Sequence, residues 1–293
     1  SPRRLPAPPP GTVAKQEHRR INLGDQRVMR STITRRARAV VAGAALLTLM
    51  VGAITAQPGP TRVFTGPNPG DKLGEALAAV PDITGDGRPE ILVGVFRADR
   101  PASPTTIADA GAAWLVDGAR LTVLRKFQGE KTDARLGYAV AGVPDIDGDG
   151  AGDLLLGAPR HEGVAYYSGR VYVHSGKTGA LITSLDGAVA TAQFGFALAG
   201  LDDLDGDSRG EILIGAWAQG GTAGKDAGRV FLYSGKDRKL LKEWQGEGES
   251  HYFGVSVAGV PDADGDGKMD VLIGAHYWNK PSSLQAGKAY LYS

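Results

Sequence analysis

The chain has 293 residues with 43 glycines and no cysteine, and its formal net charge is +1. The absence of cysteine excludes disulfides, thiolate metal sites and a cysteine nucleophile. Residues 1–38 hold ten Lys or Arg against two acidic residues, so this segment carries +8 and leaves −7 for the rest of the chain. An acidic body is not typical of nucleic-acid binders, which present a clustered basic face. It suits a protein that binds cations.

The first 61 residues contain no repeat and are interpreted as a leader. Residues 1–28 are rich in Pro and Arg and begin without Met, which predicts a disordered arm or upstream sequence read through into the chain. From Met29, arginines are followed by the uncharged residues 39–56 and then by prolines, which is the order of a secretory signal. We therefore expect a signal peptide at 29–56 and a linker at 57–61.

Export by this leader has two open alternatives. The uncharged run of 18 residues could just span a bilayer, but its Ala, Gly and Thr content and the following Pro58 and Pro60 favour cleavage. Arg35 and Arg36 also permit twin-arginine export. We expect a mature chain without a stable membrane span that is secreted, extracellular or on the cell surface, with the periplasm as the alternative.

An acidic, glycine-rich loop that runs into an apolar segment occurs four times. The copies are PDITGDGRPEILVG, PDIDGDGAGDLLLG, DDLDGDSRGEILIG and PDADGDGKMDVLIG. Their central aspartates are Asp86, Asp149, Asp207 and Asp266, so the steps are 63, 58 and 59 residues. Self-similarity at so regular a step is the signature of a repeat architecture.

The second repeat shows how one unit is built. Residues 136–143 are small and apolar, and after the acidic loop Leu154 to Leu156 form a continuous apolar run, so both segments read as buried strands. Residues 170–174 alternate, residues 175–179 supply turn chemistry, and residues 181–185 return as a fourth strand. A helix-free unit of this size cannot bury both faces alone, so the repeats predict an all-β fold, a β-propeller of four-stranded antiparallel blades over residues 62–293. A two-sheet sandwich is the structural alternative, but it does not explain one acidic loop in every unit.

The two ends of the repeat region leave the number of blades open. Residues 62–66 resemble the last strand of a repeat, whereas the fourth repeat stops after its third strand. The two ends could therefore meet and close a four-bladed ring without an open sheet edge. The preceding repeats continue with SGK where this chain stops, which favours a larger propeller that has been cut short.

The acidic loops carry oxygen ligands at alternate positions, which favours Ca²⁺ over Mg²⁺ because Mg²⁺ demands tight octahedral geometry and keeps several waters. We expect no Lys or Arg in register to neutralise these carboxylates. Solvated turns are the alternative, and four aligned copies argue against them. The predicted ligands, in which the fourth residue of each set acts through its backbone carbonyl, are Asp82, Thr84, Asp86, Arg88 and Glu90 in the first loop; Asp145, Asp147, Asp149, Ala151 and Asp153 in the second; Asp203, Asp205, Asp207, Arg209 and Glu211 in the third; and Asp262, Asp264, Asp266, Lys268 and Asp270 in the fourth.

Two details refine the calcium prediction. Thr84 replaces a carboxylate, so we expect the first loop to bind most weakly. The spacing also resembles half of an EF-hand, which needs a glutamate at loop position twelve. An apolar residue stands at that position in every copy, so the EF-hand alternative fails; these residues are Val93, Leu156, Ile214 and Ile273.

The segments LGYAVAGVPDIDGDGAGDLLLGAP and FGVSVAGVPDADGDGKMDVLIGAH closely resemble the FG-GAP repeats of integrin α-subunit propellers, which also occur in secreted bacterial proteins. The resemblance covers residues 61–293, and the first copy departs most, with Leu73-Gly74 and Gly94-Val95-Phe96. It implies a calcium-braced propeller, seven-bladed in the family, that acts in adhesion or ligand binding. Only four repeats are visible here.

The resemblance also implies that the calcium loops are structural and lie on the face opposite the ligand. The ligand would then meet the loops between the second and third strands and between blades. Aromatic residues in these loops could stack on sugars or anchor a protein partner, although packing between blades would explain them equally well. The candidates are Tyr166, Trp217, Tyr277 and Trp278.

No catalytic constellation is visible in the sequence. The histidines are scattered, GxSxG and HExxH are absent, and the paired carboxylates are better explained as metal ligands. We therefore expect a calcium-binding adhesion or ligand-binding module that is not an enzyme, with an extracellular protein or glycan as partner and no nucleic acid. The alternatives are a non-catalytic accessory propeller of an exported hydrolase and a purely structural surface repeat.

Overall fold

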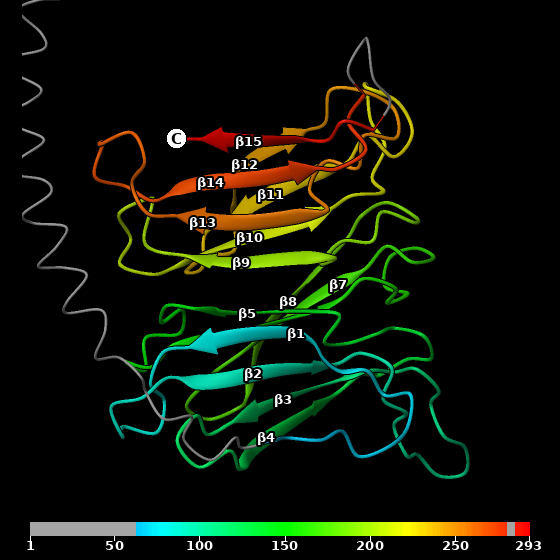
Figure 1. Cartoon of the computed structure of the whole chain (residues 1–293), viewed down its shortest axis with the longest axis vertical. Coiled ribbons are helices and arrows are strands. Elements are labelled where there is room, and N and C mark those ends of the chain that lie inside the picture. Colours follow the sequence, from blue (N-terminus) through cyan, green and yellow to red (C-terminus); the bar gives the residue numbers. More distant parts are fainter. Residues whose placement is uncertain (1–62, 280–284) are drawn as a thin grey trace, which may run out of the picture. The chain divides into compact units, whose positions relative to one another are not determined.

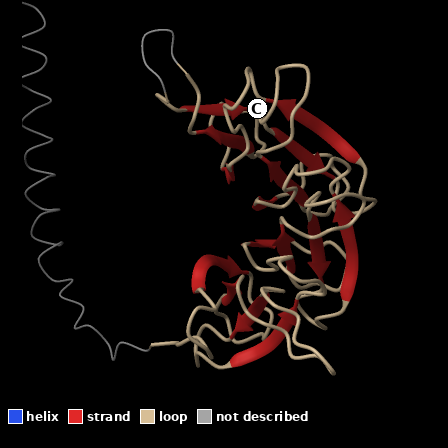
Figure 2. Ribbon diagram, turned by 90° about the vertical axis from the view of Figure 1, so that its right-hand side faces the viewer, coloured by secondary structure: helices blue, strands red, loops and turns tan. Residues whose placement is uncertain are grey.

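The structure is a computed structural model that describes residues 63–279 and 285–293. The predicted arm, signal peptide and linker lie outside these residues. The described part consists of strands and loops (Figure 2). Within it, no helix has the length and apolarity needed to cross a bilayer.

Within the described residues, fifteen strands form four antiparallel sheets, each in the order of the sequence. The first three sheets have four strands and the last has three described strands. This confirms the predicted all-β propeller of antiparallel blades. The blades are β1 (Leu73–Val80), β2 (Glu90–Val95), β3 (Ala112–Val116) and β4 (Val123–Gln128); β5 (Ala139–Val143), β6 (Asp153–Ala158), β7 (Arg170–His174) and β8 (Leu181–Asp186); β9 (Ala197–Leu201), β10 (Glu211–Ala216), β11 (Arg229–Tyr233) and β12 (Leu240–Gln245); and β13 (Ser256–Val260), β14 (Asp270–Ala275) and β15 (Lys288–Tyr292).

The first strand of each blade lies beside the first strand of the next, so β1, β5, β9 and β13 follow one another (Figure 1). Between successive blades, apolar side chains of the second and third strands form three cores. Leu155 and Leu213 are fully buried in these cores, whereas the equivalent Leu272 of β14 is 37% exposed. The exposure follows because no described sheet packs on that side of the fourth blade.

Glycines set the distance between neighbouring blades. Gly254 has φ +83°, which favours glycine, and its N–H donates a hydrogen bond of 2.9 Å to the carbonyl of Gly274 in its own blade. Its own carbonyl oxygen faces the preceding blade, where a Cβ added to Gly215 would lie 2.1 Å away. The same close approach joins Gly157 to the carbonyl oxygen of Gly195, at 2.2 Å. The glycines of the FG and GA dipeptides in the sequence are therefore a steric requirement of blade stacking.

His161 is a buried titratable group of the second blade, with 1% of its surface exposed. Burial lowers its pKa to about 4, and the charges of Arg170 and Lys131 lower it further. Its Nδ1 lies 3.4 Å from the hydroxyl oxygen of Tyr172. Because the folded chain keeps this ring neutral, His161 favours the folded state above the ordinary histidine pKa of about 6.5 and opposes it as the pH falls toward 4.

We therefore expect His161→Gln to be less acid-sensitive than the wild type between pH 6.5 and pH 4. Urea denaturation at several pH values would measure the free energy of unfolding of both proteins. The exposed Leu240 offers the control, since Leu240→Gln removes no titratable group and should leave the pH dependence unchanged. Equal pH profiles for wild type and His161→Gln would contradict the assignment.

Candidate metal centre

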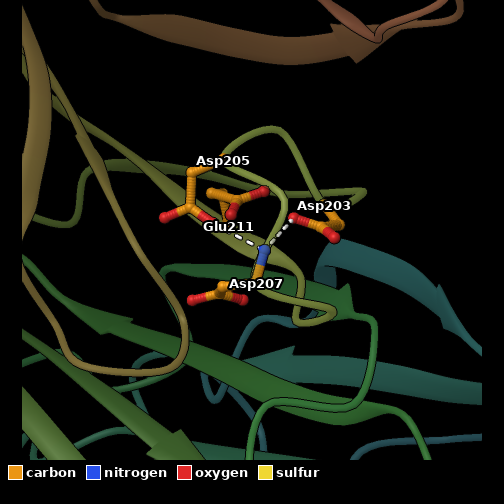
Figure 3. A group of neighbouring side chains, drawn as sticks. All are labelled: Asp203, Asp205, Asp207 and Glu211. Carbon is orange, nitrogen blue, oxygen red and sulfur yellow. Dashed lines mark hydrogen bonds between the residues drawn. The ribbon is translucent and has the colours of Figure 1, made fainter.

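The third acidic loop, between β9 and β10, brings four carboxylates together (Figure 3). Asp203, Asp205, Asp207 and Glu211 each place one oxygen within 4.8 Å of the others. The loop curls because its backbone donates to its own side chains: the Asp207 N–H donates to carboxylate oxygens of Asp203 and Asp205, both at 3.1 Å. From the adjoining strand end, the Ser234 hydroxyl donates to Asp207 Oδ2 at 3.2 Å. These contacts hold the carboxylates in place against their mutual repulsion.

Glu211 supplies the observation that points to a cation. Its side chain is 0% exposed, and Oε2 accepts a hydrogen bond of 2.7 Å from the Leu204 N–H. Oε1 is buried without a hydrogen-bond partner in the structure. Burial raises the pKa of Glu211 to about 7, and the neighbouring aspartates add to the rise. A buried carboxylate oxygen without a donor is costly, and a hard cation among these four groups would satisfy it.

The second and fourth loops each bring three aspartates within the same distance. These are Asp145, Asp147 and Asp149, and Asp262, Asp264 and Asp266. In the fourth loop Asp270 repeats the arrangement of Glu211: Oδ2 accepts from the Ala263 N–H at 2.7 Å, whereas Oδ1 is buried and unpartnered. In the second loop Asp153 differs, because both of its oxygens accept from backbone N–H groups, of Ile146 at 2.7 Å and Gly176 at 3.0 Å. Burial raises the pKa of Asp153 to about 6.

The first loop is different from the others. Among the described residues, Asp82, Asp86 and Glu90 do not form a cluster as tight as those of the other loops. Asp117 stands where the later blades have a serine, and it binds Arg120 at 2.7 Å, so that the guanidinium lies 3.7 Å from Asp86 Oδ2. Thr84 Oγ1 donates to Asp82 at 3.5 Å and brings no charge. That this loop binds most weakly stays a prediction, and the Arg120 charge gives it a second physical reason.

The predicted backbone ligands share one arrangement. The N–H of each donates to the carboxylate of the aspartate two residues earlier, at distances from 2.8 to 3.0 Å. This Asx-type contact fixes the backbone at the position whose carbonyl was predicted to bind the ion. The four residues are Arg88, Ala151, Arg209 and Lys268.

The expectation that no basic group neutralises the acidic loops is wrong. Arg120 reaches the first loop from the β3–β4 turn, and the Arg209 guanidinium lies 3.4 Å from Asp145 of the preceding blade. The sequence of a single acidic loop cannot predict either contact, because Arg120 belongs to a different hairpin and Arg209 belongs to a different blade.

The four predicted ligand-face aromatics lie at the other end of the blades, since each follows the strand that leaves an acidic loop. Tyr166 and Tyr277 are exposed, at 57% and 36%, whereas Trp217 and Trp278 are half-buried. Trp278 donates its indole N–H to Glu247 at 2.9 Å and lies under the Lys288 ammonium. Tyr166 stacks on Tyr167 with ring centroids 3.9 Å apart. Trp278 is therefore occupied by contacts with the β12–β13 loop and with β15.

Trp217 and Tyr277 belong to a larger group that sequence reasoning missed. Consecutive rings of this aromatic series approach with centroids 4.5 to 5.7 Å apart and cross all four blades. Several members adjoin the repeated dipeptides in the sequence, as Phe196 follows Phe194-Gly195, and this was the available signal. The series comprises Phe96, Tyr138, Phe196, Trp217, Tyr252, His276 and Tyr277.

Comparisons with known proteins agree with the repeat pattern. The FG-GAP repeat family matches residues 136–174 and 253–292. Integrin alpha-5 of Xenopus laevis is 34% identical over 215 residues, which cover 67% of this chain and 19% of the relative. Integrin alpha-V of Gallus gallus is 32% identical over 212 residues, with 67% and 19% covered. The chain thus spans about a fifth of the length of these curated relatives.

Among solved structures, the Dos1 propeller is similar with a TM-score of 0.40 and 11% identity, over 74% of this chain and 46% of that chain. A rhamnogalacturonan lyase of Bacillus licheniformis is similar with a TM-score of 0.39 and 18% identity, over 67% and 39%. With the repeats, the blades and the integrin relatives in agreement, the chain belongs to the family of FG-GAP repeat proteins that includes the propellers of integrin α-subunits.

Proposed function

We propose that this chain is an exported, calcium-braced propeller that binds an extracellular protein or glycan at the blade ends opposite the acidic loops. The calcium assignment rests on one observation above all. Glu211 buries a carboxylate oxygen that has no hydrogen-bond donor, and the same carboxylate places one oxygen within 4.8 Å of ligand atoms from three aspartates. Oxygen donors on a flexible loop are the set that Ca²⁺ prefers. The integrin relatives support an adhesion role for the same fold.

The ion would act as a brace rather than as a catalyst. Each loop joins the first strand of a blade, beside its neighbours, to the buried second strand. A cation held by the loop cancels the repulsion between its carboxylates and binds the folded chain only, because the unfolded chain does not assemble the ligands. Loops occupied by calcium would therefore stabilise the stacking of the blades, and this stacking positions the aromatic residues at the opposite end of the blades.

The aromatic series supports ligand binding at that opposite end. Aromatic rings bury large area at low conformational cost and are enriched at binding hot spots. Tyr277 is 36% exposed at one end of the series and contacts Tyr252, which in turn contacts Trp217. The rings are thus held in place by one another before any ligand arrives, which reduces the entropy lost on binding.

We expect Trp217→Ala and Tyr277→Ala to weaken binding to immobilised glycans or extracellular-matrix proteins about tenfold or more, as hot-spot truncations do. Binding would be measured by surface plasmon resonance for the ligands that the wild type binds. Leu240→Ala removes an exposed apolar side chain from an outer strand and is the matched control. The assignment of this face would be contradicted if Trp217→Ala and Tyr277→Ala fail to fold. It would also be contradicted if both variants fold and bind the ligand as the wild type does.

A further inference from the structure

We propose that the Arg209 side chain, which belongs to the third blade, sets the calcium affinity of the second blade's loop. Its Nη1 lies 3.4 Å from Oδ2 of Asp145, the first ligand of that loop. The guanidinium also lies against the loop backbone, because a Cβ added to Gly148 would be 2.5 Å from Nη2. A fixed positive charge from one blade is thus placed on the ion-binding loop of its neighbour. This inference rests on the proposed calcium site in the second loop.

Asp145 cannot bind both Arg209 and a metal ion at full strength, because both of its carboxylate oxygens already accept hydrogen bonds from the loop backbone. Oδ1 accepts from the Gly148 N–H at 2.6 Å, and Oδ2 accepts from the Gly150 N–H at 3.0 Å as well as facing Arg209. The ion-free loop gains from the guanidinium, because that charge offsets the repulsion among the three aspartates. A bound divalent ion would be repelled by the same charge. Arg209 therefore stabilises the ion-free loop relative to the ion-bound loop and lowers its affinity.

The fourth loop provides an internal comparison. It carries the same four acidic positions as the second loop, with glycines at the same two places. Among the described residues, no arginine or lysine forms an ion pair with Asp262, Asp264 or Asp266. The two loops share their acidic positions, but in the described part of the chain basic side chains lie against the second loop only, with Arg209 at Asp145 and Lys177 at the Asp149 carbonyl oxygen. The second loop should therefore bind calcium less tightly than the fourth.

The seventh loop position, counted from the first aspartate, reaches the preceding blade more than once. Lys268 occupies it in the fourth loop, and its ammonium donates to the carbonyl oxygen of Leu204 in the third loop at 2.9 Å. In the third loop this position is Arg209, and in the second it is Ala151, which has no charge to extend. At this position the side chain contacts the preceding blade, whereas the backbone carbonyl is the predicted ligand of its own loop. A substitution of Arg209 or Lys268 therefore removes the side-chain contact and keeps the carbonyl.

The experiment compares calcium titrations of the full chain by isothermal calorimetry. Arg209→Gln removes the charge and keeps a polar side chain, so one site should bind calcium about tenfold more tightly than in the wild type. The gain should shrink at high salt because the charges are screened. It should also vanish in the Asp149→Ala background, in which the second loop is disabled; Asp147→Ala disables the same loop if the first variant fails to fold. Lys268→Gln is the matched control, and its effect should persist in that background.

The outcomes separate the two proposals. If the wild type binds calcium and Arg209→Gln leaves every site unchanged, or weakens one, the role of Arg209 is overturned and the calcium assignment stands. A gain that persists when the second loop is disabled would also overturn it, because the charge would then act elsewhere. A wild type that binds no calcium overturns the proposed function and this inference together.

Discussion

Gly215→Ala is expected to destabilise the propeller by about 3 kcal/mol or more, at the upper end of what one added methyl group costs in a packed interior. The new Cβ would lie 2.1 Å from the carbonyl oxygen of Gly254 in the next blade. This oxygen belongs to backbone whose N–H is bonded to Gly274, so it cannot move without disturbing the fourth blade. The third and fourth blades would have to separate, and the core between them would lose its close packing. Chemical denaturation followed by tryptophan fluorescence would measure the loss.

Gly274→Ala is the matched control for this prediction. Gly274 is the equivalent glycine of the fourth blade, and a Cβ there would meet the Ser256 hydroxyl at 2.3 Å but no backbone atom of another blade. A hydroxyl can rotate away, so we expect the control to cost much less, and Ser256→Ala should recover part of what it does cost. Similar losses for Gly215→Ala and Gly274→Ala would show that the cost arises within a sheet and not between blades.

The repeat pattern predicts most of the fold because each blade contains its own signals. The apolar run from Leu154 to Leu156 lies in β6, and the predicted return strand at residues 181–185 lies in β8. Even the first repeat, which departs most from the family pattern, forms the hairpin of β3 and β4. Strand periodicity, turn residues and glycine placement are local properties, so a single sequence contains them.

The features that the sequence missed all depend on contacts between repeats or on the partners of single atoms. The aromatic series joins Phe96 to Tyr277 through residues that adjoin strands of all four blades. Arg209 contacts a residue 64 positions away. The unpartnered Oε1 of Glu211 could not be foreseen either, because Asp153 at the equivalent position uses both oxygens. Spacing predicts a ligand set for each loop, and Thr84 marks the first loop as different in the sequence. The basic neighbours of the loops follow only from the arrangement of hairpins and blades.

Removal of calcium is expected to lower the melting temperature substantially, because several loops would lose their counter-ion at once. When the calcium concentration is about 100 times the dissociation constant of a site, that site adds roughly 2.7 kcal/mol to the stability of the native state. Extracellular calcium sites have dissociation constants on the order of 0.1 to 1 mM, so calcium must be supplied in that excess to give the full effect. The raised pKa of Glu211, about 7, fixes the pH dependence. Without calcium, the cost of its buried charge grows as the pH rises from the ordinary glutamate range through 7, so the stabilisation by calcium should be larger at pH 7 than at pH 5.

Thermal melts with calcium and with excess chelator would measure this effect in the wild type and in the double variant Asp149→Ala with Asp266→Ala. Both substitutions remove a member of a three-aspartate cluster, so the calcium-dependent shift should shrink by the contribution of two loops. Asp237→Ala is the control, because Asp237 pairs with Lys239 in the β11–β12 turn, outside the acidic loops. Its shift should equal that of the wild type. A wild-type melting temperature that ignores calcium would reject the metal assignment, whereas an undiminished shift in the double variant would place the ions elsewhere.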